Sequence, residues 1–187
     1  MNGVIRWSLQ GNLFSYVSIP TGETACLDSQ GKYGASAQVV VNTCNTGLAS
    51  QAWELRDILI EQGIQGTSET ACVDVKGDSI ADHTWVTPFF CTLGINEHWT
   101  YINGQLQGVT TATVKTCLAE GTVGWVQLET CNGSASQTWY VQGGAGSGVA
   151  IQNGGSGNCL DSRGAYGAIQ LRDNPCNGGY NQSWLLQ

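Results

Sequence analysis

A tryptophan that recurs at a nearly constant spacing constrains this chain more than any other feature. Successive copies lie 46, 46, 40 and 45 residues apart, and in most of them the setting is Gln-x-Trp or a close variant. A fixed period of this size means that one supersecondary unit has been copied, and that the copies pack together to make the fold. The recurring tryptophans are Trp7, Trp53, Trp99, Trp139 and Trp184.

Each copy follows the same order of segments. Between one tryptophan and the next, the sequence predicts two strands, Cys-Leu-Asp or a variant, a glycine-rich turn, another strand, a second cysteine and a polar loop. No linker separates the copies, so we expect a single domain over residues 1–187. Its four units are about residues 7–53 (unit one), 54–99 (unit two), 100–139 (unit three) and 140–187 (unit four).

The composition favours an all-β protein. Charged residues make up only 11% of the chain and glycine accounts for 26 residues, and no window has the apolar spacing of a long amphipathic helix. Short β-branched or aromatic runs at residues 38–41, 58–60 and 125–128 are bounded by turn-forming residues, which is typical of strands.

The charge and the cysteines bear on partners and location. A net charge of −7 with only 7 Lys and Arg residues gives no basic surface, so we expect neither nucleic acid nor an anionic membrane as a partner. No apolar stretch approaches the roughly 18 residues of a bilayer-spanning helix, so membrane insertion is not expected. Eight cysteines in four pairs favour an oxidising compartment, and we expect a secreted protein. Because residues 1–4 do not begin a signal peptide, we expect a trimmed signal or non-standard export, with a cytosolic protein of eight free thiols as the alternative.

The cysteine pairs predict disulfides. Zinc sites bring their ligands in close pairs such as C-x2-C, whereas these partners are 18, 19, 14 and 17 residues apart and each pair lies inside one unit. We therefore expect no metal and no cofactor, and one disulfide per unit, each contributing about 3 kcal/mol. The expected pairs are Cys26–Cys44, Cys72–Cys91, Cys117–Cys131 and Cys159–Cys176.

The repeat resembles that of the ricin B-type lectins, also called carbohydrate-binding module family 13. The resemblance rests on Cys-Leu-Asp at 26–28 and 159–161, Cys-Val-Asp at 72–74, and the recurring Gln-x-Trp, and it covers residues 7–184. It implies a β-trefoil, which has three units, whereas this chain has four. We expect a four-lobed closed barrel, which would need larger core side chains or leave a central cavity. The alternative is a three-lobed trefoil with the fourth unit packed outside or swapped into a neighbouring chain.

The resemblance also implies a shallow sugar pocket in each unit. In this family an Asp two residues after the first cysteine accepts hydrogen bonds from sugar hydroxyls, an aromatic ring stacks on the sugar, and an Asn before Gln-x-Trp completes the polar edge. Carried over, the sugar contacts are Asp161, Tyr166, Gln170, Asn181 and Gln182 in unit four, Asp74, Phe89 and Asn96 in unit two, and Asp28 and Tyr33 in unit one. Trp85 and His83 are also expected near the pocket of unit two. Unit three has Ala119 in place of the Asp, so we expect no binding there.

These residues also have plainer interpretations. The aspartates could simply cap turns, and the two tyrosines could be ordinary turn residues. We expect Asp161 to face solvent, so that its replacement by alanine weakens binding and spares the fold. The Gln-x-Trp tryptophans are expected in the core.

The resemblance implies a non-enzymatic, multivalent lectin for glycans of the galactose or N-acetylgalactosamine type. The alternatives are a binding module of a glycoside hydrolase and a trefoil-type protease inhibitor, although Lys and Arg are scarce for an inhibitory loop. An enzyme is not expected, since Asp and Glu are scattered singly and no G-x-S-x-G or HExxH motif occurs. The sequence makes no prediction of oligomeric state.

Overall fold

The computed structural model describes residues 8–10, 13–17, 24–32, 38–109, 113–143, 148–167 and 169–187. Over these residues the chain is all-β, as expected, with short strands joined by turns and three-residue 3-10 helices. No helix of the described part is long and apolar enough to cross a bilayer. Trp7 and Tyr33, which figure in the predictions above, lie outside the described residues.

The strands are grouped here by the four units defined above. Unit one contains β1 (Ser8–Gln10), β2 (Leu13–Val17), β3 (Thr24–Asp28) and β4 (Val40–Thr43). Unit two contains β5 (Leu55–Gly63), β6 (Thr70–Val75), β7 (Thr84–Phe90) and the start of β8 (His98–Ile102). Unit three contains β9 (Gln105–Gln107), β10 (Thr116–Glu120), β11 (Val126–Thr130) and the start of β12 (Trp139–Gly143). Unit four contains β13 (Val149–Asn153), β14 (Cys159–Asp161), β15 (Arg172–Asn174) and β16 (Leu185–Leu186).

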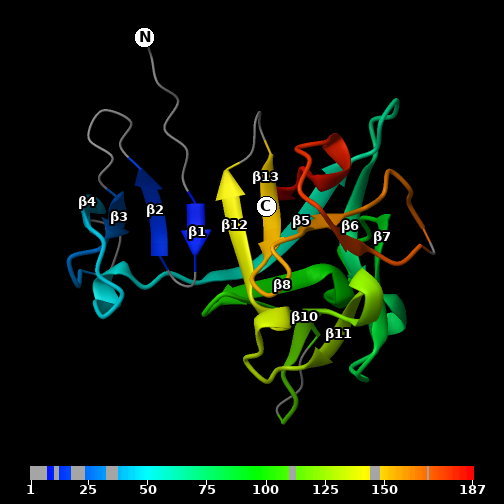
Figure 1. Cartoon of the computed structure of the whole chain (residues 1–187), viewed down its shortest axis with the longest axis horizontal. Coiled ribbons are helices and arrows are strands. Elements are labelled where there is room, and N and C mark those ends of the chain that lie inside the picture. Colours follow the sequence, from blue (N-terminus) through cyan, green and yellow to red (C-terminus); the bar gives the residue numbers. More distant parts are fainter. Residues whose placement is uncertain are drawn as a thin grey trace.

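Six strands from units two, three and four close into a ring, and Figure 1 shows two of them, β12 and β13, side by side. β5 pairs with β8 and β8 with β9, while β12 pairs with β13 and β16 with β5. A bridge between Val149 of β13 and Trp184, the residue before β16, continues the ring. Between β9 and β12, the backbone N–H of Trp139 donates to the carbonyl of Gly104, the residue before β9, at 2.7 Å. This closed ring is the barrel of a β-trefoil.

Three hairpins, β6–β7, β10–β11 and β14–β15, cap one end of the ring. β7 pairs with β11, and a bridge joins Trp125 to Arg172. The Leu171 N–H donates to the Val86 carbonyl at 2.8 Å, and the Val126 N–H donates to the Leu171 carbonyl at 3.0 Å. The three hairpins therefore meet around a pseudo-threefold axis, one from each unit of the ring.

The core lies inside this ring. The Gln-x-Trp tryptophans of units two, three and four are fully buried there, as expected, together with branched aliphatic side chains from the cap hairpins. Trp53 of unit one is only half-buried and is not part of this core. The fully buried tryptophans are Trp99, Trp139 and Trp184.

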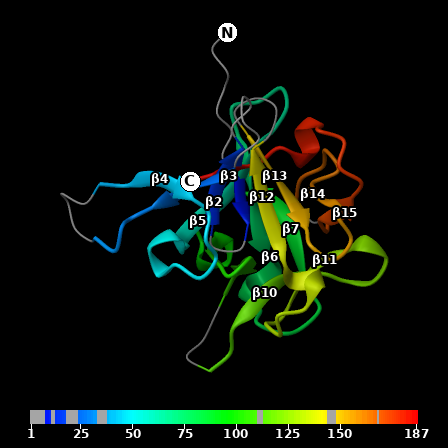
Figure 2. The same cartoon turned by 60° about the vertical axis from the view of Figure 1, so that its left-hand side comes forward.

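Unit one lies outside the ring, which corrects the expected four-lobed closed barrel. It joins through β1, whose Leu9 pairs with Val141 of β12, and β2, β3 and β4 extend that sheet away from the ring (Figure 2). Three fully buried tryptophans and their aliphatic neighbours form the core of the six-stranded ring, whereas a wider ring of four lobes would need larger core side chains or leave a central cavity. The alternative, a three-lobed trefoil with an additional unit, describes the arrangement of the described residues.

The four disulfides are formed as predicted, one inside each unit. Their Cα–Cα distances are 4.9, 5.0, 5.1 and 5.0 Å, and no cysteine is free. Each one ties the strand that ends near the Asp position to the strand that precedes the polar loop. Four disulfides indicate an extracellular or otherwise oxidising location.

Candidate functional site

The tryptophan of each unit fixes the strand that carries the candidate Asp. Its indole N–H donates to the carbonyl of the residue after the first cysteine, at distances of 2.8–3.1 Å. The next residue is Asp28, Asp74, Ala119 or Asp161, so the same hydrogen bond sets the backbone at all four positions. The pairs are Trp53 with Leu27, Trp99 with Val73, Trp139 with Leu118, and Trp184 with Leu160.

The Gln of Gln-x-Trp fixes the polar loop beside that strand. In unit four the Gln182 side-chain oxygen accepts the Asn177 N–H at 2.8 Å, and its amide donates to the Pro175 carbonyl at 3.1 Å. Gln51 and Gln137 make the corresponding bonds in units one and three. These bonds hold the polar loop, and the Gln182 amide, a predicted sugar contact, also donates to Asp161 at 3.0 Å.

Unit two has Glu97 where the other units have Gln. Its carboxylate accepts the Thr92 N–H at 2.9 Å and the Leu93 N–H at 2.7 Å, so the loop is held in the same way. A carboxylate cannot donate, however, so Glu97 cannot bond to Asp74 as Gln182 bonds to Asp161. A negative charge stands where the other units place a hydrogen-bond donor.

A depression of about 440 Å³ lies over unit two and brings together its three predicted residues, Asp74, Phe89 and Asn96. Phe89 on β7 is 40% exposed, so its ring is available for stacking. Gly94 leaves room for the Asn96 side chain, because a Cβ on Gly94 would lie 2.5 Å from Asn96 Oδ1. The rest of the wall, which sequence reasoning missed, consists of Lys76, Gly77, Asp78, Thr87, Thr92 and Gly167.

Asp74 keeps most of its acceptor capacity. It accepts one hydrogen bond from the described residues, donated by Asn96 Nδ2 at 2.7 Å, whereas a carboxylate can accept about four. Burial, and then the negative charges of Glu97 and Asp78, raise the pKa of Asp74 from 3.8 to about 6. An under-bonded carboxylate at the floor of an open depression is suited to accept hydroxyl hydrogen bonds from a ligand.

Asp161 in unit four differs from Asp74, although it occupies the same place in the repeat. Its carboxylate accepts hydrogen bonds from the Arg163 N–H, Asn181 Nδ2, Asn174 Nδ2 and Gln182 Nε2, and it is only 3% exposed. Burial raises the pKa of Asp161, but these hydrogen bonds outweigh it and the pKa is lowered. The expectation that this carboxylate faces solvent is wrong, because four donors from its own unit surround it.

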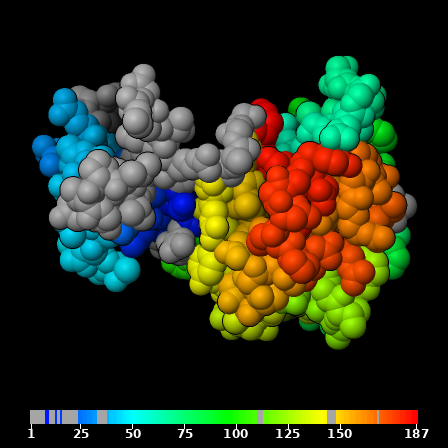
Figure 3. Space-filling model, turned by 45° about the horizontal axis from the view of Figure 1, so that its top comes forward, coloured from blue at the N-terminus to red at the C-terminus, as the bar shows by residue number. Residues whose placement is uncertain are grey.

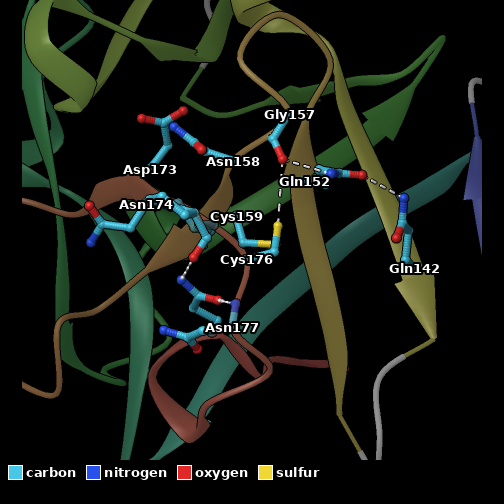
Figure 4. The surroundings of a disulfide bond; sticks show 12 residues. Gln142, Gln152, Gly157, Asn158, Cys159, Asp173, Asn174, Cys176 and Asn177 are labelled. Carbon is cyan, nitrogen blue, oxygen red and sulfur yellow. Dashed lines mark hydrogen bonds between the residues drawn. A yellow bond between two sulfur atoms is a disulfide. The ribbon is translucent and has the colours of Figure 1, made fainter.

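Asn174 is the residue that sequence reasoning overlooked in unit four. It lies two residues before Cys176, the place of Phe89 in unit two, and it flanks the Cys159–Cys176 disulfide together with Asn177 (Figure 4). Counting two residues back from the second cysteine identifies it. Unit four therefore places an amide that bonds to its own Asp where unit two places a stacking ring.

Two other predicted residues of unit four point elsewhere. Gln170 lies six residues before Cys176, and its amide donates to the Val126 carbonyl of unit three at 3.0 Å, which removes it from the pocket of Asp161. The Tyr166 hydroxyl lies 3.5 Å from the Gly63 carbonyl of unit two. The exposed ring near the Asp161 turn is that of Tyr180, since a Cβ on Gly164 would lie 2.3 Å from its hydroxyl oxygen.

Asp28 in unit one is intermediate between these two cases. It accepts hydrogen bonds from the Gln30 N–H at 2.7 Å, from Asn42 at 2.9 Å and from Gln51 at 3.2 Å. The hydrogen bond from Asn42, followed by that from the Gln30 N–H, lowers the pKa of Asp28 to about 2. In unit three, Ala119 is buried and offers no acceptor side chain.

A second hollow, of about 530 Å³, lies where the cap hairpins meet. Trp85, Trp125 and Gln170 each lie six residues before the second cysteine of their unit, and His83, Thr122 and Gln127 complete the lining. Lys76 Nζ lies 4.8 Å from the Trp85 ring and the Arg172 guanidinium lies 4.3 Å from the Trp125 ring. Trp85 and His83 therefore line this hollow and not the depression of unit two, where they were expected.

The model of the ricin-type β-trefoil lectin domain matches residues 15–139 and 107–184, which together span most of the chain. The chain belongs to the ricin-type β-trefoil lectin family. A search of curated proteins found no match.

Two solved structures illustrate the likeness of this ricin-type lectin domain to known folds. The designed threefold symmetric protein ThreeFoil matches with a TM-score of 0.55 and 18% identity, over 69% of this chain and 96% of that chain. The hemolytic lectin CEL-III matches with a TM-score of 0.54 and 21% identity, over 96% of this chain and 43% of that chain. At these identities the likeness concerns the fold alone.

Proposed function

We propose that this ricin-type lectin domain is a non-enzymatic carbohydrate-binding protein that takes a galactose-type pyranose in the depression of unit two. One observation carries the proposal. The depression combines a carboxylate with unused acceptor capacity, an exposed aromatic ring and a side-chain amide, from Asp74, Phe89 and Asn96. A pyranose offers one C–H face for stacking and a rim of hydroxyls that need donors and acceptors.

Galactose and N-acetylgalactosamine fit this chemistry better than glucose. Their axial 4-hydroxyl leaves the opposite ring face free of polar groups, which suits stacking on Phe89. The neighbouring 3- and 4-hydroxyls can both donate to one carboxylate, here Asp74.

The sites of the four units are proposed to be unequal. Unit two ranks first, because Asp74 accepts one internal hydrogen bond. Asp28 accepts three and Asp161 four, so units one and four contribute weaker sites to multivalent binding. Unit three, with Ala119, is expected to bind nothing. A binding module of a glycoside hydrolase would use the same sites in a longer chain.

A glycan array probed with the protein in its disulfide-bonded form tests the function. We expect binding to glycans that end in galactose or N-acetylgalactosamine, and weaker binding to those that end in glucose or mannose. Millimolar free galactose should compete, since a single shallow site of this kind is worth about 4–5 kcal/mol. A natively folded protein that binds no glycan on the array would overturn the proposal.

Glycan binding is expected to weaken as the pH falls through about 6. The pKa of Asp74 is raised to about 6, so acid protonates this carboxyl and removes the charged acceptor that the sugar hydroxyls need. Glu97→Gln removes a neighbouring negative charge and supplies the amide donor that Gln182 provides in unit four. The pKa of Asp74 should then fall, and the loss of binding should move to lower pH.

Calorimetric titration with galactose between pH 4.5 and 7.5 measures this shift. Glu69→Gln changes an exposed carboxylate outside the depression and is the matched control, with an unchanged pH profile. If Glu97→Gln leaves the profile of the wild type in place, Asp74 is not the group that titrates with binding.

A further inference from the structure

Unit one contains the local interactions that fold the other units. Its disulfide is formed, the Trp53 indole N–H donates to the Leu27 carbonyl at 3.1 Å, and the Gln51 side chain accepts the Asn45 N–H at 2.8 Å. Unit one is therefore built as a lobe of the same kind as the three lobes of the ring.

The apolar face of unit one is exposed where the counterparts in the ring are buried. Val39, five residues before the second cysteine, is 50% exposed, whereas Val86, Val126 and Leu171 at the same place are fully buried. Val41 is 46% exposed, whereas Pro88, Leu128 and Asp173 are buried. These two valines lie at the positions that the other units use for burial.

The same contrast extends to two more positions of the unit. Trp53 and Leu27 are half-buried, whereas the tryptophan and the residue after the first cysteine are fully buried in each of the other three units. We call Leu27, Val39, Val41 and Trp53 the open face of unit one. Contiguous apolar surface of this kind on a soluble protein marks an interaction site.

Within the ring, the corresponding faces of the three cap hairpins meet one another and complete a single core with the barrel strands. Val86, Val126 and Leu171 meet at the pseudo-threefold axis, where backbone hydrogen bonds join Leu171 to Val86 and Val126 to Leu171. Each lobe therefore contacts two others, and a face of this type is fully buried only when three lobes share it. The ring of units two to four is already closed, so unit one cannot bury its apolar face there against two other units.

Unit one is also displaced from the ring in space. Figure 3 shows its blue and cyan residues at the left of the view, to one side of the body formed by the other units. Among the described residues its pairing with the ring is that of β1 with β12, which leaves β2, β3 and β4 to one side.

We infer that three copies of this chain associate through the open faces of their units one, which together form a second trefoil. The partner is a further copy because each cap hairpin of the ring meets the same face of the other two units in this structure. In another copy of the chain, unit one is again the unit with an uncovered face, so it is the unit that can pair with this one. Three copies are needed because two would leave one side of each face open, and a closed threefold arrangement is an ordinary symmetry for a homo-oligomer.

The trimer holds whether or not the proposed sugar site is correct, since it uses none of the residues of the depression in unit two. It places three such depressions on one particle, which would raise the avidity for a surface that carries many glycans.

The mass of the full chain in solution tests the inference. Light scattering coupled to size-exclusion chromatography should give three times the chain mass of 19.8 kDa at micromolar concentration, with dissociation on dilution. A monomer or a dimer across that concentration range would overturn it.

Val39→Asp locates the contact, because it puts a charge at the centre of the open face. We expect a monomer whose disulfides are all formed and whose galactose binding at a single site is unchanged. Val123→Asp is the matched control, since Val123 is 77% exposed on unit three and outside the open face, and it should remain a trimer. Amide exchange should be slow in β4 of the wild type and fast in Val39→Asp. A Val39→Asp protein that stays trimeric would show that the copies meet elsewhere.

Discussion

Replacing Asp74 with asparagine is expected to weaken galactose binding at least tenfold, while the melting temperature at pH 7.5 stays unchanged or rises. The carboxylate has one internal partner among the described residues, so its remaining acceptor capacity is available to sugar hydroxyls. A charge-assisted hydrogen bond is worth about 1.5–3 kcal/mol, and the whole site only about 4–5 kcal/mol. Asparagine has no charge and one acceptor oxygen, so it cannot replace the pair of bonds.

The stability half of this prediction follows from the sign of the pKa shift. The folded-state pKa of Asp74 is raised from 3.8 to about 6, so the fold favours the neutral carboxyl. That advantage is complete below pH 3.8 and is lost as the pH rises through about 6. At pH 7.5 the ionised group is disfavoured beside Glu97, and a neutral asparagine relieves this. A substantially lower melting temperature would identify Asp74 as a structural residue.

Two exposed aromatic residues of the same unit form a matched control. Phe89→Ala should reduce binding as well, since Phe89 lies in the depression, whereas Trp85→Ala should not, since Trp85 lines the hollow between the cap hairpins. Their exposed fractions are similar, so general effects of removing a surface ring are the same in both. Equal losses in the two variants would contradict the assignment of the site to unit two. Calorimetry with galactose, beside a thermal melt, measures all three variants.

Asp161→Ala is expected to have the opposite profile, with a large loss of stability and a small loss of galactose binding. The substitution leaves the amides of Asn174, Asn181 and Gln182 and the Arg163 N–H without their acceptor, in a place that is buried for Gln182 and part-buried for the others. Each unsatisfied group costs about 1–3 kcal/mol, and partial relaxation leaves a net loss of about 2–4 kcal/mol. For a chain of this length that corresponds to a melting temperature lower by about 5–15 °C.

A second substitution tests whether the loss of stability in Asp161→Ala comes from hydrogen-bond donors that no longer have an acceptor. Adding Asn181→Ser, the residue that units one and three carry at this place, should recover part of the stability, because removing both partners of a buried bond costs less than removing one. Asp74→Ala should reduce the free energy of unfolding much less than Asp161→Ala, because it leaves only one donor without its acceptor.

The lowered pKa of Asp161 also predicts a pH dependence. The contribution of Asp161 to stability is present above pH 3.8 and is lost as the pH falls below that value. Urea unfolding of each variant at pH 3 and pH 7 provides the free energies, and an Asp161→Ala protein as stable as the wild type would refute the structural role.

Much of this molecule could be predicted because the information is local to each unit. The four disulfides follow from cysteines that lie inside one repeat, and the burial of Trp99, Trp139 and Trp184 follows from their period. The three residues of the depression in unit two were expected from the family resemblance, at their offsets to Cys72, Cys91 and Trp99, and the depression brings them together.

The positions that could not be predicted depend on contacts between units. Gln170 faces unit three and Tyr166 reaches unit two, because the cap hairpins of different units pack against one another. The sequence makes no distinction between a unit inside the ring and a unit beside it, since each carries the same internal bonds.

The sequence by itself therefore determined what one unit is: an Asp after a disulfide-bonded cysteine, held by a tryptophan and a polar loop. Only the tertiary structure decided which three units close the ring, because the bonds inside a unit do not determine which other units it packs against. It also decided that Asp161 is enclosed by four donors while Asp74 faces an open depression with one. The reason is that side-chain hydrogen bonds depend on which groups the fold brings within reach, and equivalent positions in a repeat need not have equivalent neighbours.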